Sequence, residues 1–335
     1  VPSNIREVKP YYLLSVPALA KNFRKNIEAS IRAKGAKTEK LFNFALKTAY
    51  EYNQDGYMKG RGWRFVLKPL VSLFDKILFS KVRVAFGGEL AFFVGGGALL
   101  DSELQRFFYA IGIPMFQGYG LSEATPVLSS NGPKRHRFGS SGVLVKPLEI
   151  KICDSEGNAL PTGEKGEIVV KGENVMAGYW RNPEATAQTV KDGWLYTGDI
   201  GYIDNNGFLI ITGRKKNVII RANGKNVFPE EIEAYLAMIP DVKDVMVYES
   251  KGKLCAAIQP TDINNNYVIK GIKHGIKQYN NDAAPYKRIV AYDFIAREFP
   301  KTTSLKIKRK EALANSQNGS ELKANFSIAK IFPWF

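Results

Sequence analysis

The chain has 335 residues, of which 45% are hydrophobic, and a formal net charge of +16 at pH 7. It can bury a sizeable core and should form about two domains, and its charge favours polyanions such as nucleotides, nucleic acid or anionic lipid headgroups. Cys153 and Cys255, like His136 and His274, lack metal-ligand spacing, which argues against a zinc site or a disulfide framework and for a reducing compartment.

No window of about 20 residues is apolar enough to span a bilayer. The best candidate, residues 82–100, contains Arg83, Glu89 and five glycines, so we predict two core strands there. Residues 11–20 have the outline of a signal peptide, an apolar run ending in Ala-Leu-Ala. Pro17 and the missing initiator Met instead favour a start inside a domain.

Residues 1–80 read as basic and helical, with helices over 41–52 and 65–79 around a glycine-rich link at 55–62. From Lys81 the pattern predicts strands at 81–88 and 90–100, a helix started by Asp101, and a strand leading into residues 117–123. This alternation predicts an α/β sheet with ligands at the strand ends.

Two stretches at these strand ends are candidate ligand sites. Residues 95–98, Gly-Gly-Gly-Ala, let a flat group approach the backbone, although a packing turn would use the same residues. Residues 117–123, QGYGLSE, combine an aromatic face, a hydroxyl and a carboxylate, which suit a base, a phosphate and a hard cation. The structural alternative is a strand-end turn with a capping serine.

Residues 139–191 predict a small all-β unit that ends in a short helix capped by Asn182 and begun by Pro183. Strands at 208–212 and 217–220 then flank a Gly-Arg-Lys-Lys corner, and a helix starts at Pro229. Asp199 and Arg214 each lie beside a glycine and suit a small molecule with hydroxyls, unless they are solvated charges in hairpin turns.

The remaining segment predicts a helix at 230–238, strands at 242–249 and 254–259, a helix at 267–279 and a strand at 288–294. Residues 299–313, FPKTTSLKIKRKEAL, are strongly basic, which alone would indicate a solvated patch or a polyanion contact. Residues 315–323 read as a polar linker. For the last ten residues we favour docking on the fold over a membrane contact or disorder.

Together these motifs resemble the adenylate-forming superfamily of acyl- and aryl-CoA synthetases. The resemblance rests on QGYGLSE, on TGD followed by DNNGF, GRKK and NGKNVFPEEIE, and on PKTTSLKIKR. The Val-Pro turn at 16–17 with its following helix, and the FGGEL phrase, are most similar to long-chain fatty acyl-CoA synthetases.

The resemblance implies the remainder of a large α/β domain, with a sheet, helices and a small β-barrel-like subdomain, followed by a small α+β domain. The expected bounds are 1–138 for the α/β part, 139–213 for the β-rich subdomain, 214–314 for a mobile domain and 315–335 for a tail. The family's Ser/Thr/Gly-rich triphosphate loop ending in Pro-Lys-Gly has no match in these residues. We therefore expect this chain to be the C-terminal part of a longer enzyme.

The resemblance assigns nucleotide-binding roles to residues within positions 1–213 and to Arg214. Tyr119 would lie against adenine, Ser122 would reach phosphate, and Glu123 would hold Mg²⁺. Asp199 would chelate the ribose hydroxyls, with Arg214 as a second contact. The other expected ATP/AMP contacts are Gly96, Gly97, Ala98, Gln117 and Gly118.

Further roles fall on the small domain. Lys216 would be the hinge, and Arg221, Gly224 and Asn226 would face the site in the thioester-forming arrangement. Lys306 would be the catalytic lysine, whose charge balances that of the transferring phosphoryl group. Leu305 stands where the family has glycine, and we expect the turn before Lys306 to tolerate it.

The implied reaction joins a long-chain fatty acid to CoA with MgATP, through acyl-AMP, and releases pyrophosphate and AMP. Implied partners are the carboxylate substrate, ATP and CoA, in a cytoplasmic protein with a peripheral membrane contact and no specific nucleic acid. Three alternatives stay open: an adenylation enzyme that serves a carrier protein, an aryl-CoA ligase, and a non-catalytic polyanion-binding protein.

Overall fold

The computed structural model describes residues 2–15, 17–96, 101–302 and 306–318. The chain divides into two compact units, residues 1–212 and 213–335, which we describe separately. Strand β10 (Leu209–Arg214) runs through the division.

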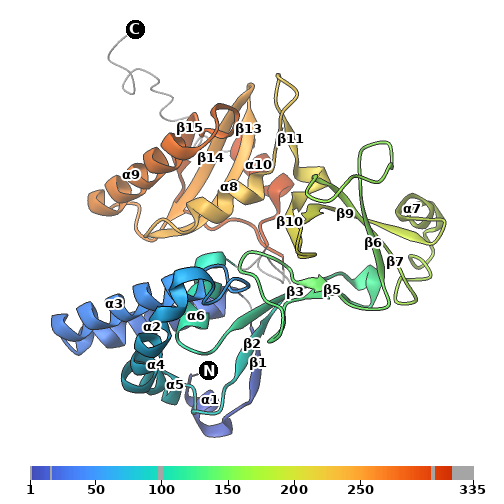
Figure 1. Ribbon diagram of the computed structural model, residues 1–335. Helices are drawn as coiled ribbons and strands as arrows, with labels where there is room; N and C mark the ends of the chain where they lie inside the picture. The colour runs from blue at the N-terminus through green and yellow to red at the C-terminus, as the bar shows by residue number, and fades with distance from the viewer. Residues whose placement is uncertain (1, 16, 97–100, 303–305, 319–335) are drawn as a thin grey trace. The chain divides into compact units, whose positions relative to one another are not determined.

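The N-terminal part of the first unit is an α/β layer (Figure 1). Its sheet has the order β1-β2-β3-β4-β5; β1, β2 and β3 pair in parallel, and β4 and β5 continue the sheet antiparallel. The strands are β1 (Tyr12–Ser15), β2 (Phe92–Gly95), β3 (Met115–Gly120), β4 (Val127–Ser130) and β5 (Val143–Leu144). The α-helices are α1 (Pro2–Val8), α2 (Pro17–Ala33), α3 (Ala36–Asn53), α4 (Lys68–Phe74), α5 (Ser80–Val84) and α6 (Ser102–Ala110).

Apolar spacing explains how these helices pack. In α3 the buried Phe42, Ala45, Leu46 and Ala49 recur at the three- and four-residue intervals of one helix face. They join one core with residues of α2, α6, β2 and β3, so the helices bury their apolar faces against the sheet. Asp101 caps α6, as predicted, by accepting a hydrogen bond from the Glu103 amide.

The strand predicted at 81–88 is wrong. Between Gly62 and Val84 the chain is helical throughout, from a 3-10 helix η1 (Gly62–Leu67) through α4 and a π-helical turn η2 (Asp75–Phe79) into α5. Arg83 donates to the Asp75 carboxylate at 2.5 Å and to the Ile111 carbonyl at 2.9 Å. This packing overrides the β propensity of the alternating valines.

The rest of the first unit is β-rich, in the order β10-β9-β7-β6 with β8 beside β9. Its further elements are β6 (Glu149–Cys153), β7 (Gly166–Lys171), α7 (Pro183–Thr189), β8 (Val190–Lys191) and β9 (Trp194–Ile203). Leu128, Ile168, Val170 and Leu195 belong to a separate apolar core here. Asn182 caps α7 through the Ala185 amide, which confirms the predicted cap.

The second unit packs two helices on a three-stranded sheet, β13-β14-β15. Its elements are η4 (Lys215–Asn217), β11 (Ile219–Ile220), β12 (Asn226–Val227), α8 (Pro229–Leu236), β13 (Val242–Ser250), β14 (Lys253–Pro260), α9 (Asn266–Asp282), β15 (Ala291–Phe294) and α10 (Arg309–Asn318). The buried Ile232, Leu236, Ile272 and Ile276 join α8 and α9 to the core of this sheet.

Two predictions for the second unit need correction. The strand expected at 217–220 shortens to β11, because the chain first makes the 3-10 turn η4. Residues 315–318 belong to α10 instead of a linker. The rest of that linker and the final aromatic segment lie outside the described residues. Among the described residues, no helix is both long and apolar enough to cross a bilayer.

Candidate functional site

Two residues predicted to bind the nucleotide meet in the first unit. The Tyr119 hydroxyl, at the end of β3, donates to Asp199 Oδ2 on β9 at 2.7 Å. The Asp199 residue is only 5% exposed. A phenol ring beside a fixed carboxylate offers a flat apolar face and a hydroxyl acceptor in one place.

A bulge in β9 sets the position of Asp199. The pairing with β7 shifts register between Glu167 and Val169, opposite the Thr197–Asp199 segment. Gly198 has φ +67°, a conformation that favours glycine, and its amide donates to Glu167 Oε1 at 3.1 Å. The Asp199 amide donates to Thr197 Oγ1 at 3.1 Å. The Thr-Gly-Asp sequence therefore presents the carboxylate out of the regular ladder.

Ser122 and Glu123 form a 3-10 turn, η3 (Ser122–Ala124), directly after β3. Gly120 is required before this turn, because a Cβ there would lie 1.8 Å from the Pro126 carbonyl oxygen. The Glu123 carbonyl accepts from the Met176 amide at 2.8 Å, and its carboxylate accepts from the Tyr179 hydroxyl at 2.9 Å. Burial raises the pKa of Tyr179, and the hydrogen bond to Glu123 and the charge of that carboxylate add to the rise.

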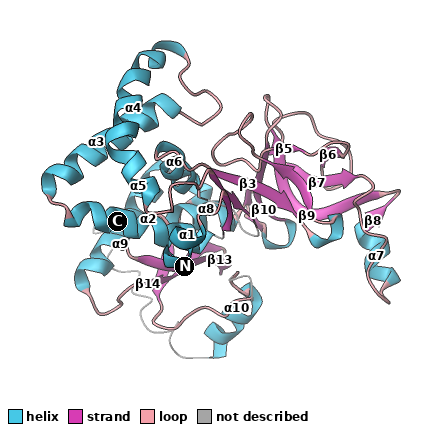
Figure 2. Cartoon of the chain, turned by 90° about the horizontal axis from the view of Figure 1, so that it is seen from below, coloured by secondary structure: helices cyan, strands magenta, loops and turns pink. Residues whose placement is uncertain are grey.

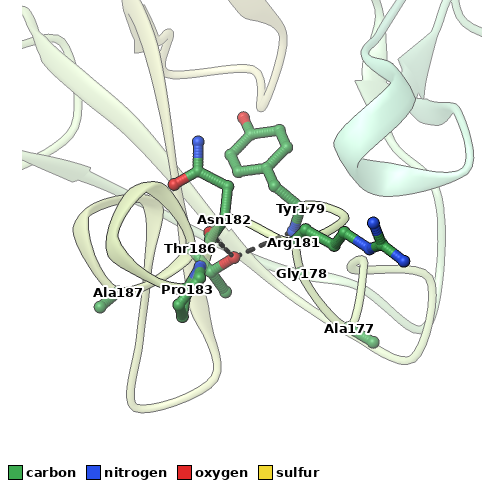
Figure 3. Close-up of a pocket in the computed structure, with 8 residues that line it drawn as sticks. All are labelled: Ala177, Gly178, Tyr179, Arg181, Asn182, Pro183, Thr186 and Ala187. Carbon is green, nitrogen blue, oxygen red and sulfur yellow. Dashed lines mark hydrogen bonds between the residues drawn. The ribbon is translucent and has the colours of Figure 1, made fainter.

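Tyr179 belongs to the wall of a shallow pocket over the start of α7 (Figure 3). The polar atoms around it serve the local fold: Thr186 Oγ1 accepts from the Tyr179 amide and donates to the Asn182 carbonyl, both at 2.9 Å. No sequence pattern indicated the hydrogen bond of Tyr179 to Glu123, because the two residues lie 56 positions apart. The eight lining residues are Ala177, Gly178, Tyr179, Arg181, Asn182, Pro183, Thr186 and Ala187.

The other expected nucleotide contacts of the first unit lie on β2 and β3. Gln117 is 3% exposed, and its amide group bonds to Ser141 Oγ and Gln105 inside the fold. Gly118 pairs with Ser130 across β3 and β4, and Gly96 follows β2. Gly97 and Ala98 lie outside the described residues.

The remaining predicted site residues belong to the second unit. Arg214 ends β10, and Lys216 lies exposed in η4. Arg221, Gly224 and Asn226 lie around the β11–β12 hairpin, which Gly224 turns with φ +74°. Arg221 also pairs with Glu249 at 3.1 Å.

Lys306 lies exposed on a loop tied by short-range bonds. The Lys306 amide donates to Thr302 Oγ1 at 3.2 Å, and the Thr302 amide donates to the Lys306 carbonyl at 2.9 Å. Leu305, which stands where the family has glycine, lies outside the described residues.

A magnesium site would depend on Glu123. The described residues contain no group of three or more His, Cys, Asp or Glu side chains placed to hold a metal. Mg²⁺ commonly binds one or two carboxylates, with substrate phosphates and water completing its shell. The half-buried Glu123 carboxylate fits that pattern, since a hydroxyl already orients it.

Comparison with known proteins shows to which family the chain belongs. Residues 2–180 match the family model described as AMP-binding enzyme. The chain belongs to the AMP-binding enzyme family. Curated relatives include the Mycobacterium bovis long-chain-fatty-acid–CoA ligase FadD15, 35% identical over 71% of this chain and 38% of that ligase. The 2-succinylbenzoate–CoA ligase of Geobacillus kaustophilus is 33% identical over 79% of this chain and 54% of its own length.

Solved AMP-binding family structures have the same fold. The anthranilate CoA ligase AuaEII, solved with anthranoyl-AMP, aligns with a TM-score of 0.65 and 25% identity over 95% of this chain and 52% of its own. O-succinylbenzoate CoA synthetase from Bacillus subtilis, in complex with ATP and magnesium, aligns at 0.58 with 30% identity over 67% and 46%. These alignments confirm the predicted fold class. The chain spans only about two fifths to just over half of these relatives.

Proposed function

We propose that this chain is the core and C-terminal part of an AMP-forming acyl-CoA ligase. The observation that supports this most strongly is the 2.7 Å bond between Tyr119 and Asp199, which joins an aromatic face to a buried carboxylate next to the Ser122–Glu123 turn. In this proposal adenine stacks on Tyr119 and the ribose hydroxyls donate to Asp199. Arg214 adds a ribose contact, and the backbone at Gly96, Gly97, Ala98 and Gly118 lies along the base.

In the first half-reaction a carboxylate oxygen of the acid attacks the α-phosphorus of ATP, and pyrophosphate leaves. Ser122 donates to a phosphate oxygen, and Lys306 bonds to the acid and the α-phosphate while negative charge builds. Glu123 would hold Mg²⁺, which supplies neutralisation of phosphate charge. In the second half-reaction the CoA sulfur attacks the acyl carbonyl, its thiol proton passes to water, and the bond from the carbonyl carbon to the phosphate oxygen breaks as AMP leaves.

The domain bounds given above, at 138, 213 and 314, belong to the same proposal. Residues 214–314 turn about Lys216 between the half-reactions, so that Lys306 withdraws and Arg221, Gly224 and Asn226 approach the thioester site. A hinge of this kind needs one residue whose φ and ψ change while its neighbours stay rigid, and Lys216 lies in a short exposed turn.

The proposed acid is a long-chain fatty acid, supported by the similarity to FadD15 and to the Bacillus subtilis long-chain-fatty-acid–CoA ligase, 36% identical. An aryl acid is the second candidate, because other relatives are 2-succinylbenzoate and 4-coumarate ligases. Competition for binding between palmitoyl-AMP and an aroyl-AMP separates the two. Preferred binding of the aroyl-AMP would contradict the fatty acid assignment.

The thioester half-reaction tests the function directly. The chain is incubated with synthetic palmitoyl-AMP and CoA, and we expect palmitoyl-CoA to form above the uncatalysed rate. The Asp199→Ala variant should lose this product through weaker adenylate binding, whereas Lys306→Ala should retain it. If palmitoyl-AMP binds but the acyl group reaches only a carrier protein and never CoA, the ligase assignment is wrong.

A further inference from the structure

The helical segment between Gly62 and Val84 has an exposed apolar stripe. Trp63, Val66, Pro69, Leu73 and Ile77 follow one another at intervals of three or four residues, which places them along one side of consecutive helical turns. All five are exposed, from 39% for Ile77 to 59% for Trp63 among the large side chains. We call these five residues the outer stripe.

The same segment is also apolar on its inner side. Phe74, Phe79 and Val82 are buried in the core of the α/β layer, with Phe74 edge-on to Phe44 of α3 at 5.8 Å. A surface helix normally has one apolar face and one polar face, and a helix that is apolar on both faces has a second apolar environment. Within the first unit α3 and α4 lie together (Figures 1 and 2). The side chains of the outer stripe remain exposed in the described part of the chain.

The charges beside the outer stripe identify its environment. Residues 61–84 contain six basic side chains and one acidic side chain, Asp75, which is paired with Arg83. Lys68, Lys76 and Lys81 are exposed along the segment, and Arg61 is exposed just before it. In a symmetric dimer through this face two such basic segments would meet and repel. An anionic lipid surface instead satisfies both the apolar stripe and the cations.

The aromatic residues fit the same environment. Trp63 is exposed with the Arg64 guanidinium 5.3 Å from its ring centroid, and Phe65 is 65% exposed two residues later. Tryptophan is enriched at the level of lipid headgroups, where its ring is half in contact with hydrocarbon and its N–H meets water. A basic helical segment with apolar residues on its free face is typical of helices that lie in the plane of a membrane surface.

We propose that the outer stripe docks this protein on an anionic phospholipid bilayer, with the segment lying parallel to the membrane surface. Trp63 and Phe65 enter the headgroup region, and Lys68, Lys76 and Lys81 contact lipid phosphates. The inference is independent of the reaction proposed above, because none of these residues belongs to the nucleotide site.

Vesicle flotation of the full chain tests the proposal. We expect binding to vesicles of phosphatidylcholine with phosphatidylglycerol, weaker binding at high salt, and little binding to phosphatidylcholine alone. The Trp63→Ser/Leu73→Ser double variant should bind more than tenfold more weakly, because it removes the largest apolar group of the stripe and a second one more than half exposed. Lys76→Gln and Lys81→Gln should each weaken binding about fivefold.

Trp180→Ser is the matched control, because Trp180 is 86% exposed on the β-rich part of the same unit. It should bind as the unaltered chain does. All the substituted positions are exposed, and thermal unfolding will confirm that each variant folds. The unaltered chain should also show a blue shift of tryptophan emission on adding vesicles that Trp63→Ser lacks.

Several results would overturn the proposal. One is the absence of vesicle binding, and another is equal binding by the double variant, which would assign the contact to another part such as residues 326–335. Equal affinity for neutral and anionic vesicles would remove the role of the cations. A dimer in light scattering that Trp63→Ser/Leu73→Ser abolishes, without vesicle binding, would assign the stripe to a second copy of the chain.

Discussion

Because Tyr119 donates a hydrogen bond to Asp199, two substitutions can distinguish what each residue contributes to nucleotide binding. Tyr119→Phe keeps the ring and removes the donor, so we expect AMP affinity to fall about fivefold, since Asp199 loses its orientation. Asp199→Ala removes the proposed acceptor of the ribose hydroxyls and should lower affinity more than tenfold. Calorimetric titration with AMP measures both, with Tyr202→Phe on the same strand as control. Unchanged affinity in both variants would exclude this pair from the site.

His136 gives a pH dependence at the residue scale. It is 4% exposed among the rings of Tyr109, Phe116 and Phe138, and neither ring nitrogen has a hydrogen-bond partner in the described part of the chain. Burial lowers its pKa to about 4. Between pH 6.5 and 4 the unfolded chain binds a proton that the folded chain excludes, so the free energy of unfolding falls as pH falls through this window.

The loss in the free energy of unfolding amounts to about 3 kcal/mol once His136 is fully protonated in the unfolded chain. His136→Phe should remove this part of the acid sensitivity and leave the protein at least as stable at pH 7, because no buried nitrogen remains unpaired. Urea unfolding of the two proteins at pH 7, 6, 5 and 4 provides the comparison. Parallel pH profiles would mean that His136 does not titrate as described.

At the scale of elements, one ion pair joins α8, β13 and α10 in the second unit. Arg309 donates to Glu233 Oε2 at 2.5 Å and to the Val247 carbonyl at 3.0 Å, while Glu233 Oε1 accepts from the Val247 amide at 2.6 Å. Burial raises the pKa of Glu233, and Arg309 opposes that rise. The carboxylate therefore depends on its partner to stay charged.

Arg309→Met should destabilise the second unit by about 3 kcal/mol or more, because it leaves a buried carboxylate unpaired. Adding Glu233→Met should recover part of the loss, since two apolar side chains fit a dry site better than one isolated charge. Denaturant unfolding of the single and double variants tests this coupling. Additive losses would show that the two residues act independently.

The helices and strands were predictable where one periodicity dominated. The three-residue and four-residue spacing of the buried residues in α3 and the continuous apolar run of β14 follow directly from the sequence. The helix at 80–84 was not predictable, because its valines favour a strand. The hydrogen bonds of Arg83 to Asp75 and Ile111 hold this segment in a helix. β1 was hidden in a region read as helical, since its four residues form a strand only by pairing with β2.

For the whole molecule, the central prediction concerns Lys216. Proline fixes φ near −65°, a value that 3-10 turns adopt, so Lys216→Pro should retain the turn described here and prevent others. We expect one half-reaction to fall more than tenfold while the other is retained, whereas Lys216→Ala keeps both. Separate assays of adenylate formation and thioester formation decide this. Equal loss of both half-reactions would argue against a hinge at Lys216.

The candidate site was predictable as a set of residues but not as an arrangement. Tyr119 and Asp199 were named from separate motifs 80 positions apart, and only a bulge in β9 brings the carboxylate to the phenol. Tyr179 was not predicted, because its hydrogen bond to Glu123 joins residues 56 positions apart and no local pattern indicates it. Gln117 was named as a nucleotide contact, yet its side chain bonds to Gln105 and Ser141 in the interior.

The division of the chain inside β10 has a practical consequence for splitting the gene. A cut between Thr212 and Gly213 would divide this strand and remove its last two residues from the sheet of the N-terminal product. A cut after Asn217 leaves the strand whole with the N-terminal product, and the C-terminal product then begins just before β11. Two such halves could be purified and studied separately, or labelled one at a time and then recombined.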